Sequence, residues 1–600
     1  MSPGDNGGAW PLFGLFRDPE ALSRNLARLM AEGSRAAATW LAGQSAKSQQ
    51  SLAEEIGLVV KTLKEVSDYW LSDPARAAEA QRRLMSLQFA LWTATWSRSM
   101  GLTSPYAASA PRDKRFADPE WAANPVYSWL REAYDAVTAW ATGLVADAVL
   151  DADTKRRAEF YVRQIAAALS PSNFPFANPE VLRATAASNG ENLVRGAHML
   201  AEDLEAGKGE LKLRQTDTSG FELGRDIAAT PGKVIHQNAL CQLIQYQPAT
   251  ATVAKLPLLI VPPWINKYYV LDLTPEKSFV RWAVEQGHTV FIVSWVNPDA
   301  SHAAMDWGDY MRLGILESLD VMAKATGEKR ANVAGYCVGG TLLAVTLAYL
   351  AAKGDKRIAS ATLMATQVDF REAGDLKVFA DAEQIAIVEE RMEKRGYLEG
   401  KDMALAFNML RPNDLIWPNV VNTYLLGKQP TAFDLLYWNA DATRMPAANH
   451  SFYLRSCYLN NSVAKGDVVI DGVAIDIGRI AVPVYCLAAA DDHIAPPTSV
   501  YVGARLFGGP VTFVLAGAGH IAGVMNGPAR NKYQYWTDGD ARASALDGWR
   551  RTAAEHPGSW WTHWQTWIGG LDGRSAKARR IGARVKPIED APGSYVRVKA

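Results

Sequence analysis

Three residues with complementary chemistry each follow a short apolar segment of this 600-residue sequence. Cys337 follows A-N-V-A-G-Y, Asp492 follows V-P-V-Y-C-L-A-A-A (482–490) by one residue, and His520 comes shortly after V-T-F-V-L (511–515). Each apolar segment predicts a buried strand, so each residue stands at or just beyond a strand end. Together, a thiol, an imidazole and a carboxylate can form a thiolate, move its proton and stabilise the charged imidazole. The set therefore predicts nucleophilic acyl transfer.

The residues around Cys337 predict a sharp turn between a strand and a helix. An apolar run ends at Ala334, a Gly-rich turn follows, and an apolar helical pattern runs from about Gly340 to Ala352. This order matches the nucleophile elbow of the α/β-hydrolase fold, G-x-S-x-G, with cysteine in place of serine. A lone G-x-C-x-G also occurs by chance as a Gly-rich turn, so the surrounding pattern has to decide.

The elbow also predicts where an oxyanion would be stabilised. Gly335 and Gly339 leave room for strand and helix to pass closely. The backbone N–H of Val338, at the helix start, would then point at an oxyanion formed on a carbonyl attacked by the thiol. A second donor is expected from V-P-P-W-I-N, which follows an earlier strand, and we assign it to the backbone of Trp264 or Ile265.

The order of the three residues supports the elbow. In this fold the acid and then the histidine follow the nucleophile at later strand ends, as Asp492 and His520 follow Cys337. Of nine histidines, only His493 and His520 come just after a late apolar strand. We expect His493 to orient the neighbouring acid or cap the next turn. A shift of one residue would make Asp491 the acid.

A cysteine nucleophile favours a thioester substrate. Attacking and leaving groups are then both thiolates of similar basicity, and the acyl-enzyme keeps the reactivity of the thioester for the next step. Acyl transfer from coenzyme A is therefore favoured over hydrolysis of ordinary esters.

Composition limits the remaining classes of function. The chain is 48% hydrophobic and 21% charged with a formal net charge of zero, so it has a globular composition and no whole-chain electrostatic footprint for nucleic acid. The four cysteines are scattered without metal-ligand spacing. The first ten residues lack the features of a signal peptide, and the longest apolar run, 341–352, is too short for a membrane span. We expect a cytoplasmic protein without a metal.

The chain divides by pattern into a helical part and an α/β part. Residues 1–215 carry helical periodicity and almost no strand signal, whereas 216–600 alternate short strands with helices. Helices are expected at 19–41, 53–71, 75–96 and 126–146, after an apolar cluster formed by Trp10, Phe13, Leu15 and Phe16. Residues 370–481 interrupt the α/β part as a cap rich in aromatic residues, and Asp471-Gly472 within it predicts a hairpin. The expected fold is an α/β hydrolase with an inserted cap, preceded by a helical domain.

Seven sequence blocks give the chain a family resemblance. They are G-Y-C-V-G-G (335–340), D-D-H-I-A-P-P (491–497), G-H-I-A-G-V (519–524), V-P-P-W-I-N-K-Y-Y (261–269), L-R-P-N-D-L-I-W (410–417), Y-W-N-A-D-A-T (437–443) and A-P-G-S-Y-V (591–596). Jointly they span more than half of the chain, and the chain resembles a class I polyhydroxyalkanoate synthase.

The resemblance implies polymerisation of (R)-3-hydroxyacyl-CoA, chiefly 3-hydroxybutyryl-CoA, through an acyl-Cys337 intermediate. Coenzyme A would be the carrier and a product, with no further cofactor. Trp438, Arg411 and Asn461 fall in or near the shared blocks and are expected to face the substrate. The resemblance also implies a homodimer that associates with polyester granules and their surface proteins.

Two other functions remain open at this point. A Cys-dependent thioesterase or hydrolase on the same fold would release free acid and leave the helical part unexplained. A non-catalytic granule-surface protein would not need all three of Cys337, Asp492 and His520. The sequence also leaves open whether His520 or Asp492 activates the acceptor hydroxyl.

Overall fold

The computed structural model describes residues 18–43, 46–100 and 113–600, and the apolar cluster from Trp10 to Phe16 lies outside them. The chain splits into two compact units. The first consists of Met1–Asp217 and Arg411–Thr431, and the second of Thr218–Leu410 and Ala432–Ala600.

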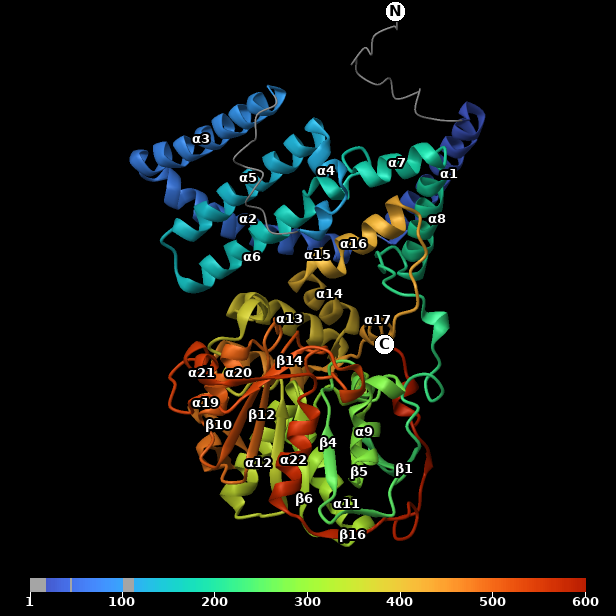
Figure 1. Cartoon of the computed structure of the whole chain (residues 1–600), viewed down its shortest axis with the longest axis vertical. Helices are drawn as coiled ribbons and strands as arrows, with labels where there is room; N and C mark the ends of the chain where they lie inside the picture. Colours follow the sequence, from blue (N-terminus) through green and yellow to red (C-terminus); the bar gives the residue numbers. More distant parts are fainter. Residues whose placement is uncertain (1–17, 44–45, 101–112) are drawn as a thin grey trace, which may run out of the picture. The chain divides into compact units, whose positions relative to one another are not determined.

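The first unit is built from helices (Figure 1). They are α1 (Pro19–Gly43), α2 (Ala46–Leu71), α3 (Pro74–Ser99), α4 (Glu120–Ala123), α5 (Pro125–Asp147), α6 (Ala152–Ala168), α7 (Pro179–Ala187) and α8 (Glu191–Ala206). The four helices expected from periodicity are present, with α1, α2, α3 and α5 each slightly longer than predicted. Side-chain caps fix several helix starts: Asn124 accepts from Val126 N–H, and Asn178 precedes Pro179 and accepts from Glu180 N–H.

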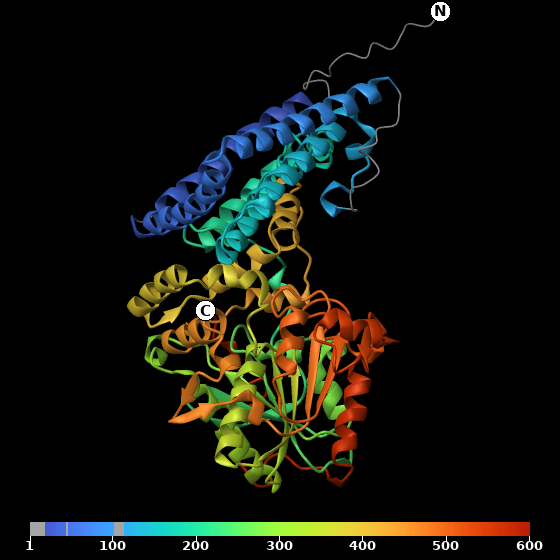
Figure 2. The ribbon, with the colours of Figure 1, turned by 90° about the vertical axis from the view of Figure 1, so that its left-hand side faces the viewer.

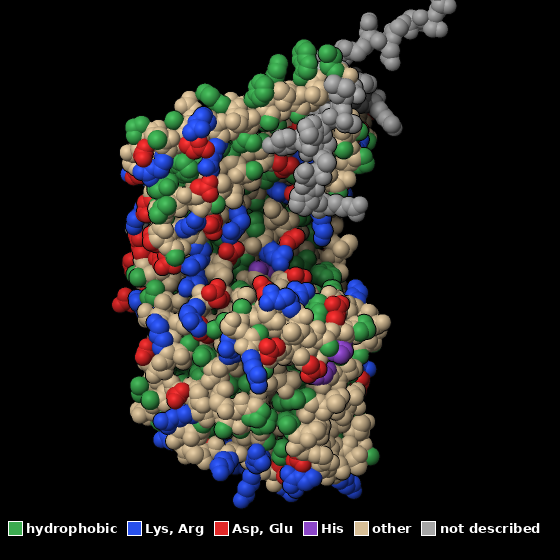
Figure 3. All heavy atoms as spheres, turned by 60° about the vertical axis from the view of Figure 1, so that its left-hand side comes forward, with side chains coloured by type: hydrophobic (Ala, Val, Ile, Leu, Met, Phe, Trp, Pro, Cys, Tyr) green, Lys and Arg blue, Asp and Glu red, His purple; other side chains and the backbone are tan. Residues whose placement is uncertain are grey.

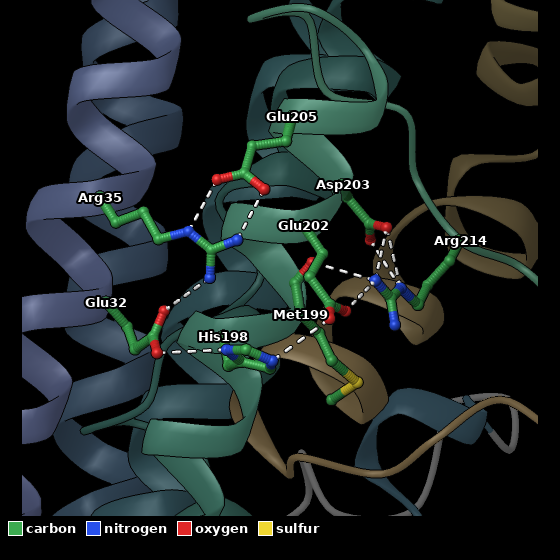
Figure 4. A network of polar contacts seen from close by, with 8 residues as sticks. All are labelled: Glu32, Arg35, His198, Met199, Glu202, Asp203, Glu205 and Arg214. Carbon is green, nitrogen blue, oxygen red and sulfur yellow. Dashed lines mark hydrogen bonds and ion pairs between the residues drawn. The ribbon is translucent and has the colours of Figure 1, made fainter.

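Charged side chains join α1 to α8 (Figure 4). The Arg35 guanidinium donates to both carboxylate oxygens of Glu205, at 2.7 and 2.6 Å, and to Glu32 at 3.3 Å. Glu32 also contacts His198 Nδ1 at 3.1 Å. Because Arg35 and its partners are substantially exposed, we expect these pairs to fix the register of the two helices more than they stabilise the fold.

A segment from the middle of the sequence packs with α8. It comprises α15 (Pro412–Leu415), α16 (Trp417–Asn419) and the π-helix η11 (Val420–Leu425). The Tyr424 hydroxyl donates to Asp203 at 2.6 Å, and Asn192 Nδ2 donates to the Leu425 carbonyl at 2.8 Å. The predicted cap 370–481 is therefore not one continuous subdomain, because residues 411–431 pack within the first unit.

The second unit contains a large central sheet whose middle strands are parallel. Eleven strands within the described residues form it in the order β15-β14-β13-β12-β7-β6-β4-β5-β2-β1-β17. Their bounds are β1 (Gly232–Gln237), β2 (Cys241–Tyr246), β4 (Leu258–Val261), β5 (Val290–Trp295), β6 (Ala331–Tyr336), β7 (Ile358–Met364), β12 (Val484–Ala489), β13 (Val511–Ala516), β14 (Gln534–Thr537), β15 (Ala554–Pro557) and β17 (Glu589–Asp590). Strands β4 to β7, β12 and β13 pair in parallel, and the strands at both edges pair antiparallel. The apolar runs predicted as strands all lie in this sheet.

Alternate residues of the central strands enter two separate cores. On β4, Leu259 and Val261 join one core while Leu258 and Ile260 join the other. Helices α11 (Glu317–Thr326) and α12 (Val338–Lys353) cover the first face, and α9 (Phe279–Glu285), α20 (Pro497–Ala504), α21 (Leu546–Thr552) and α22 (Trp561–Leu571) cover the second. Figure 2 shows α12 and α22 on opposite sides of the strands. Central strands buried on both faces explain their continuous apolar sequences.

The remainder of the cap region is a set of short helices over this unit. They are α13 (Ala382–Arg395), α14 (Gly400–Leu410), α17 (Asp434–Ala440), α18 (Ala447–Phe452), the π-helix η12 (Tyr453–Leu459) and α19 (Ser462–Lys465). The predicted hairpin is confirmed as β10 (Val468–Ile470) and β11 (Val473–Ile475), with positive φ at both Asp471 and Gly472.

Two surface features bear on the expected partners. Among the described residues, no helix combines the length and apolar character needed to cross a bilayer. The C-terminal basic stretch is exposed at Lys577, Arg580, Arg584 and Lys586. Figure 3 shows Lys and Arg side chains gathered at the lower end of that view.

Candidate active site

Cys337 occupies the strained apex between β6 and α12. Its φ of 53° and ψ of −128° lie where few non-glycine residues are found. The strain is held by close packing, because a Cβ on Gly339 would lie 2.4 Å from the Pro262 carbonyl oxygen and one on Gly335 would lie 2.5 Å from Gly340 Cα. Only glycine fits at positions 335 and 339, because any side chain there would collide with neighbouring backbone atoms. The Cys337 thiol is half-buried.

Asp492 and His520 meet beyond the ends of β12 and β13. His520 Nδ1 lies 2.6 Å from Asp492 Oδ2, and both side chains are buried. The other oxygen of Asp492 accepts from the N–H groups of Ile494 and Ala495, at 2.8 and 2.9 Å. These three hydrogen bonds leave the carboxylate one orientation, toward the imidazole. The acid beside the histidine is thus Asp492, one residue beyond Asp491.

His520 is also held from the elbow side. The Tyr336 ring stacks on the imidazole with centroids 5.2 Å apart, and its hydroxyl donates to the His520 carbonyl at 3.1 Å. Sequence reasoning missed Tyr336 in this role. Tyr336 comes directly before Cys337 in the elbow motif, and this position was the one feature of the sequence that could have indicated its role.

The electrostatics couple His520 to both neighbours. Burial lowers the pKa of the imidazole, but the Asp492 carboxylate, the Cys337 thiolate and hydrogen bonds to both raise it more, to about 10. The site therefore favours a protonated imidazole between the Asp492 carboxyl group and the Cys337 sulfur. An imidazolium beside a cysteine stabilises the thiolate form that acts as a nucleophile.

Two backbone segments are expected to supply the oxyanion donors. Val338 is the first residue of α12, so its N–H has no partner within the helix. The segment containing Ile265 follows β4, whose last residue, Val261, pairs with Gly335 of β6. Ile265 and Trp264 are both buried there.

The remaining predicted residues lie in different surroundings. Trp438 is buried, and its indole N–H donates to the Lys267 carbonyl at 2.7 Å. The Asn461 amide is bound at both ends, donating to Asp369 at 3.0 Å and accepting from Phe370 N–H at 2.8 Å. His493 is half-buried in the turn after Asp492. Arg411 belongs to the first unit, where it pairs with Asp414 at 3.3 Å.

Two buried tyrosines of η12 have pKa values that are raised by burial and in part by their electrostatic interaction with Cys337. The hydroxyls of Tyr453 and Tyr458 lie 3.5 Å apart, and burial together with negative charge that includes Cys337 raises both pKa values. The sequence places Tyr453 and Tyr458 among the aromatic residues of the cap. Nothing in their spacing distinguishes them from residues of the cap interior.

Comparisons with known proteins match most of the chain. A family model described as poly-beta-hydroxybutyrate polymerase (PhaC) N-terminus matches residues 112–283, and a model of the alpha/beta hydrolase fold matches residues 257–526. The poly(3-hydroxyalkanoate) polymerase subunit PhaC of Rhizobium meliloti is 56% identical over 98% of this chain and 96% of its own length. The corresponding subunit of Cupriavidus necator is 43% identical over 88% of this chain and 89% of its own length. The poly(3-hydroxyalkanoate) polymerase of Methylorubrum extorquens is 55% identical over 91% of each chain.

Proposed function

Because this chain belongs to the poly(3-hydroxyalkanoate) polymerase family, a family of enzymes that make polyesters, we propose that Cys337, Asp492 and His520 carry out the polymerisation. The substrate is an (R)-3-hydroxyacyl-CoA, chiefly 3-hydroxybutyryl-CoA. The observation that supports this assignment is the single imidazole of His520, which couples to the thiol and to the fixed carboxylate at once.

Acylation begins with attack of the Cys337 thiolate on the thioester carbonyl. The N–H groups of Val338 and Ile265 stabilise the oxyanion that forms. Collapse of the tetrahedral intermediate breaks the bond to the coenzyme A sulfur, and the His520 imidazolium supplies the proton that yields free CoA thiol. The product is a 3-hydroxyacyl thioester of Cys337.

Acylation changes the electrostatics of His520. Thioester formation removes the thiolate charge, which is one of the causes of the raised imidazole pKa. The pKa of His520 then falls, so the neutral imidazole can accept a proton. It takes that proton from the 3-hydroxyl of the acceptor chain while this oxygen attacks the acyl-Cys337 carbonyl. The ester forms, the thiolate leaves, and repetition extends the polymer. Asp492 orients His520; direct activation of the hydroxyl by Asp492 is the competing route.

Polymerisation rather than hydrolysis requires that water be kept from the acyl-enzyme. The buried aromatic residues Tyr453, Tyr458 and Phe370 support such a role for the cap, since their rings pack against one another at 4.9 to 6.2 Å. Trp438, Asn461 and His493 are proposed to shape substrate binding, the first two through the positions they impose on neighbouring backbone.

The remaining assignments extend the family relationship. The chain acts as a class I synthase, a homodimer at the surface of polyester granules in the cytoplasm, together with other granule proteins. Coenzyme A is the carrier and a product, and the steps above use no further cofactor.

The test is purified protein mixed with (R)-3-hydroxybutyryl-CoA, with thiol release followed while insoluble polymer is separated from free 3-hydroxybutyrate. Thiol release with polymer supports the proposal. Thiol release with only free acid would identify a Cys-dependent hydrolase instead. If no thiol is released from this substrate or from longer 3-hydroxyacyl thioesters, the proposed chemistry is wrong.

A further inference from the structure

A buried lysine that the proposed chemistry does not use lies at the end of the segment containing Ile265. Lys267 is 3% exposed, and its Nζ donates to the carbonyls of Val596 and Val598, at 3.2 and 2.5 Å. Burial, the largest influence, lowers its pKa to about 8 despite the nearby Asp441 carboxylate. Burying an ammonium group costs free energy, so a buried lysine that bonds to the C-terminal tail is expected to have a structural role.

A single threonine holds the same segment from the other side. Thr443 Oγ1 donates to the Trp264 carbonyl at 2.7 Å and accepts from Asn266 N–H at 2.8 Å. The two bonded peptide groups lie on either side of Ile265. Asn266 has a φ of 64°, so the segment turns sharply at this point. The threonine hydroxyl therefore fixes the backbone around Ile265 without using Ile265 itself.

The tail and the threonine belong to one network. The Val598 carbonyl that accepts from Lys267 also accepts from Asn297 Nδ2 at 3.3 Å. Asn297 Oδ1 in turn accepts from the N–H of Arg444, the residue after Thr443, at 3.0 Å. These hydrogen bonds thus form one network, which joins residues 264–267 to 297, 443–444 and 596–598 although they are far apart in sequence.

The residues that lead from β4 into this segment lie directly beside the elbow. A Cβ on Gly339 would approach the Val261 and Pro262 carbonyl oxygens to 2.5 and 2.4 Å, so the chain leaving β4 touches the first turn of α12. Any shift of residues 264–267 would change the position of their N–H groups relative to Val338 and Cys337.

We propose that Thr443 and Lys267, the latter through the C-terminal residues 596–598, are positioning residues that hold the Ile265 N–H in place as the second oxyanion donor. This inference rests on the proposed acyl-cysteine chemistry. Neither side chain touches the substrate. Both act through the backbone, which places a donor where negative charge develops.

The first experiment compares two reactions of the same thiol in Thr443→Val. Acylation by 3-hydroxybutyryl-CoA passes through an oxyanion, whereas alkylation by iodoacetamide does not. Removing an oxyanion donor costs about 10²–10³ in rate, so a displaced donor is expected to slow acylation roughly 10- to 100-fold. Alkylation of Cys337 should stay within about threefold of wild type, and Thr443→Ser should restore acylation.

Controls separate this role from a general loss of structure. Thr326→Val removes another buried hydroxyl, one that donates to the Met322 carbonyl within its own helix, and should leave both reactions unchanged. Equal losses of acylation and alkylation in Thr443→Val, or normal acylation, would overturn the proposal. Failure of the acyl-cysteine chemistry itself would appear separately, as undiminished polymer synthesis by Cys337→Ala.

The second experiment tests the tail. Lys267→Met and a chain ending at Tyr595 should each show the same selective loss of acylation, because each removes one side of the contacts between Lys267 and the tail. The shorter chain also loses the Asn297–Val598 hydrogen bond and the Lys599–Asp441 ion pair. Combining the two changes should add little to either alone. Fully additive losses would show that the tail and Lys267 act separately and would overturn that part of the inference.

Discussion

His520 Nδ1 and Asp492 Oδ2 lie 2.6 Å apart, and the second oxygen of this carboxylate is bound by two backbone N–H groups of the following turn. The acid is therefore immobile before the imidazole becomes charged. A fixed carboxylate selects the tautomer and orientation of the histidine and stabilises its imidazolium. Because Asp492 is the carboxylate held against His520, its role can be separated by experiment from that of the adjacent Asp491.

Asp492→Asn should lower kcat by about 10²–10⁴ while the protein stays folded, because the amide keeps the shape but loses the charge that orients and stabilises His520. The measurement is thiol release from 3-hydroxybutyryl-CoA, with circular dichroism to verify folding. Asp491→Asn is the matched control, since this adjacent carboxylate is exposed. Comparable losses in both variants would contradict the assignment of Asp492.

Cys337→Ala should remove activity by roughly three to six orders of magnitude, as expected for loss of a nucleophile. Residual activity above about a tenth of wild type would exclude Cys337 from this role.

Iodoacetamide should label Cys337 well before the other three cysteines. Cys241, Cys457 and Cys486 are fully buried, and burial raises their thiol pKa values well above the ordinary range. Mass spectrometry of the labelled protein identifies the site. Cys241→Ala, on β2, should keep both the labelling and the activity, because this thiol is buried and takes no part in the proposed chemistry.

The contribution of His520 to stability should decline in alkaline solution. Its folded pKa of about 10 lies above the ordinary value of 6.5, so the folded state binds the proton more tightly than the unfolded state. This contribution is complete below about pH 6.5 and is lost as the pH rises through about 10. Urea unfolding of wild type and His520→Gln should therefore give a stability difference that shifts against wild type between about pH 6.5 and pH 10. A difference that is constant over this range would contradict the raised pKa.

Gly196→Ala should destabilise the first unit by at least about 2 kcal/mol, since a Cβ on this α8 residue would lie 1.9 Å from the Tyr424 carbonyl oxygen. Gly143→Ala in α5 is the control. A Cβ there meets nothing within 4 Å, so helix propensity predicts a gain of about 0.5–1 kcal/mol. Thermal or urea unfolding measures both. Similar effects of the two substitutions would show that residues 411–431 do not pack tightly on α8.

The sequence alone determined the features that local patterns record. Apolar runs bounded by glycine and polar residues predicted the central strands, because strands buried on both faces must be apolar throughout. Asp471-Gly472 predicted its hairpin because both positions need positive φ. The elbow, and the order in which acid and histidine follow it, placed Cys337, Asp492 and His520 at or just beyond the ends of three strands of the α/β part.

The edge strands were less visible from sequence. Among them, β14, β15 and β17 are short, and β15 and β17 are exposed, so hydrophobic alternation cannot reveal them. Their existence depends on partners such as β13 and β1. The helices α6, α7 and α8 lie within the part predicted to be helical but were not predicted individually, although their apolar residues follow helical spacing as clearly as those of α2, α3 and α5.

Only the tertiary structure decided which residues far apart in sequence contact one another. It assigned residues 411–431 to the first unit, gave the Trp438 indole N–H to the Lys267 carbonyl, and brought the C-terminal tail to Lys267. The last two contacts join a side chain to a backbone group 171 and 331 positions away. Local periodicity reports whether a residue is buried, but hydrogen bonds of this kind depend on the path of the whole chain and leave no mark on the spacing of neighbouring residues.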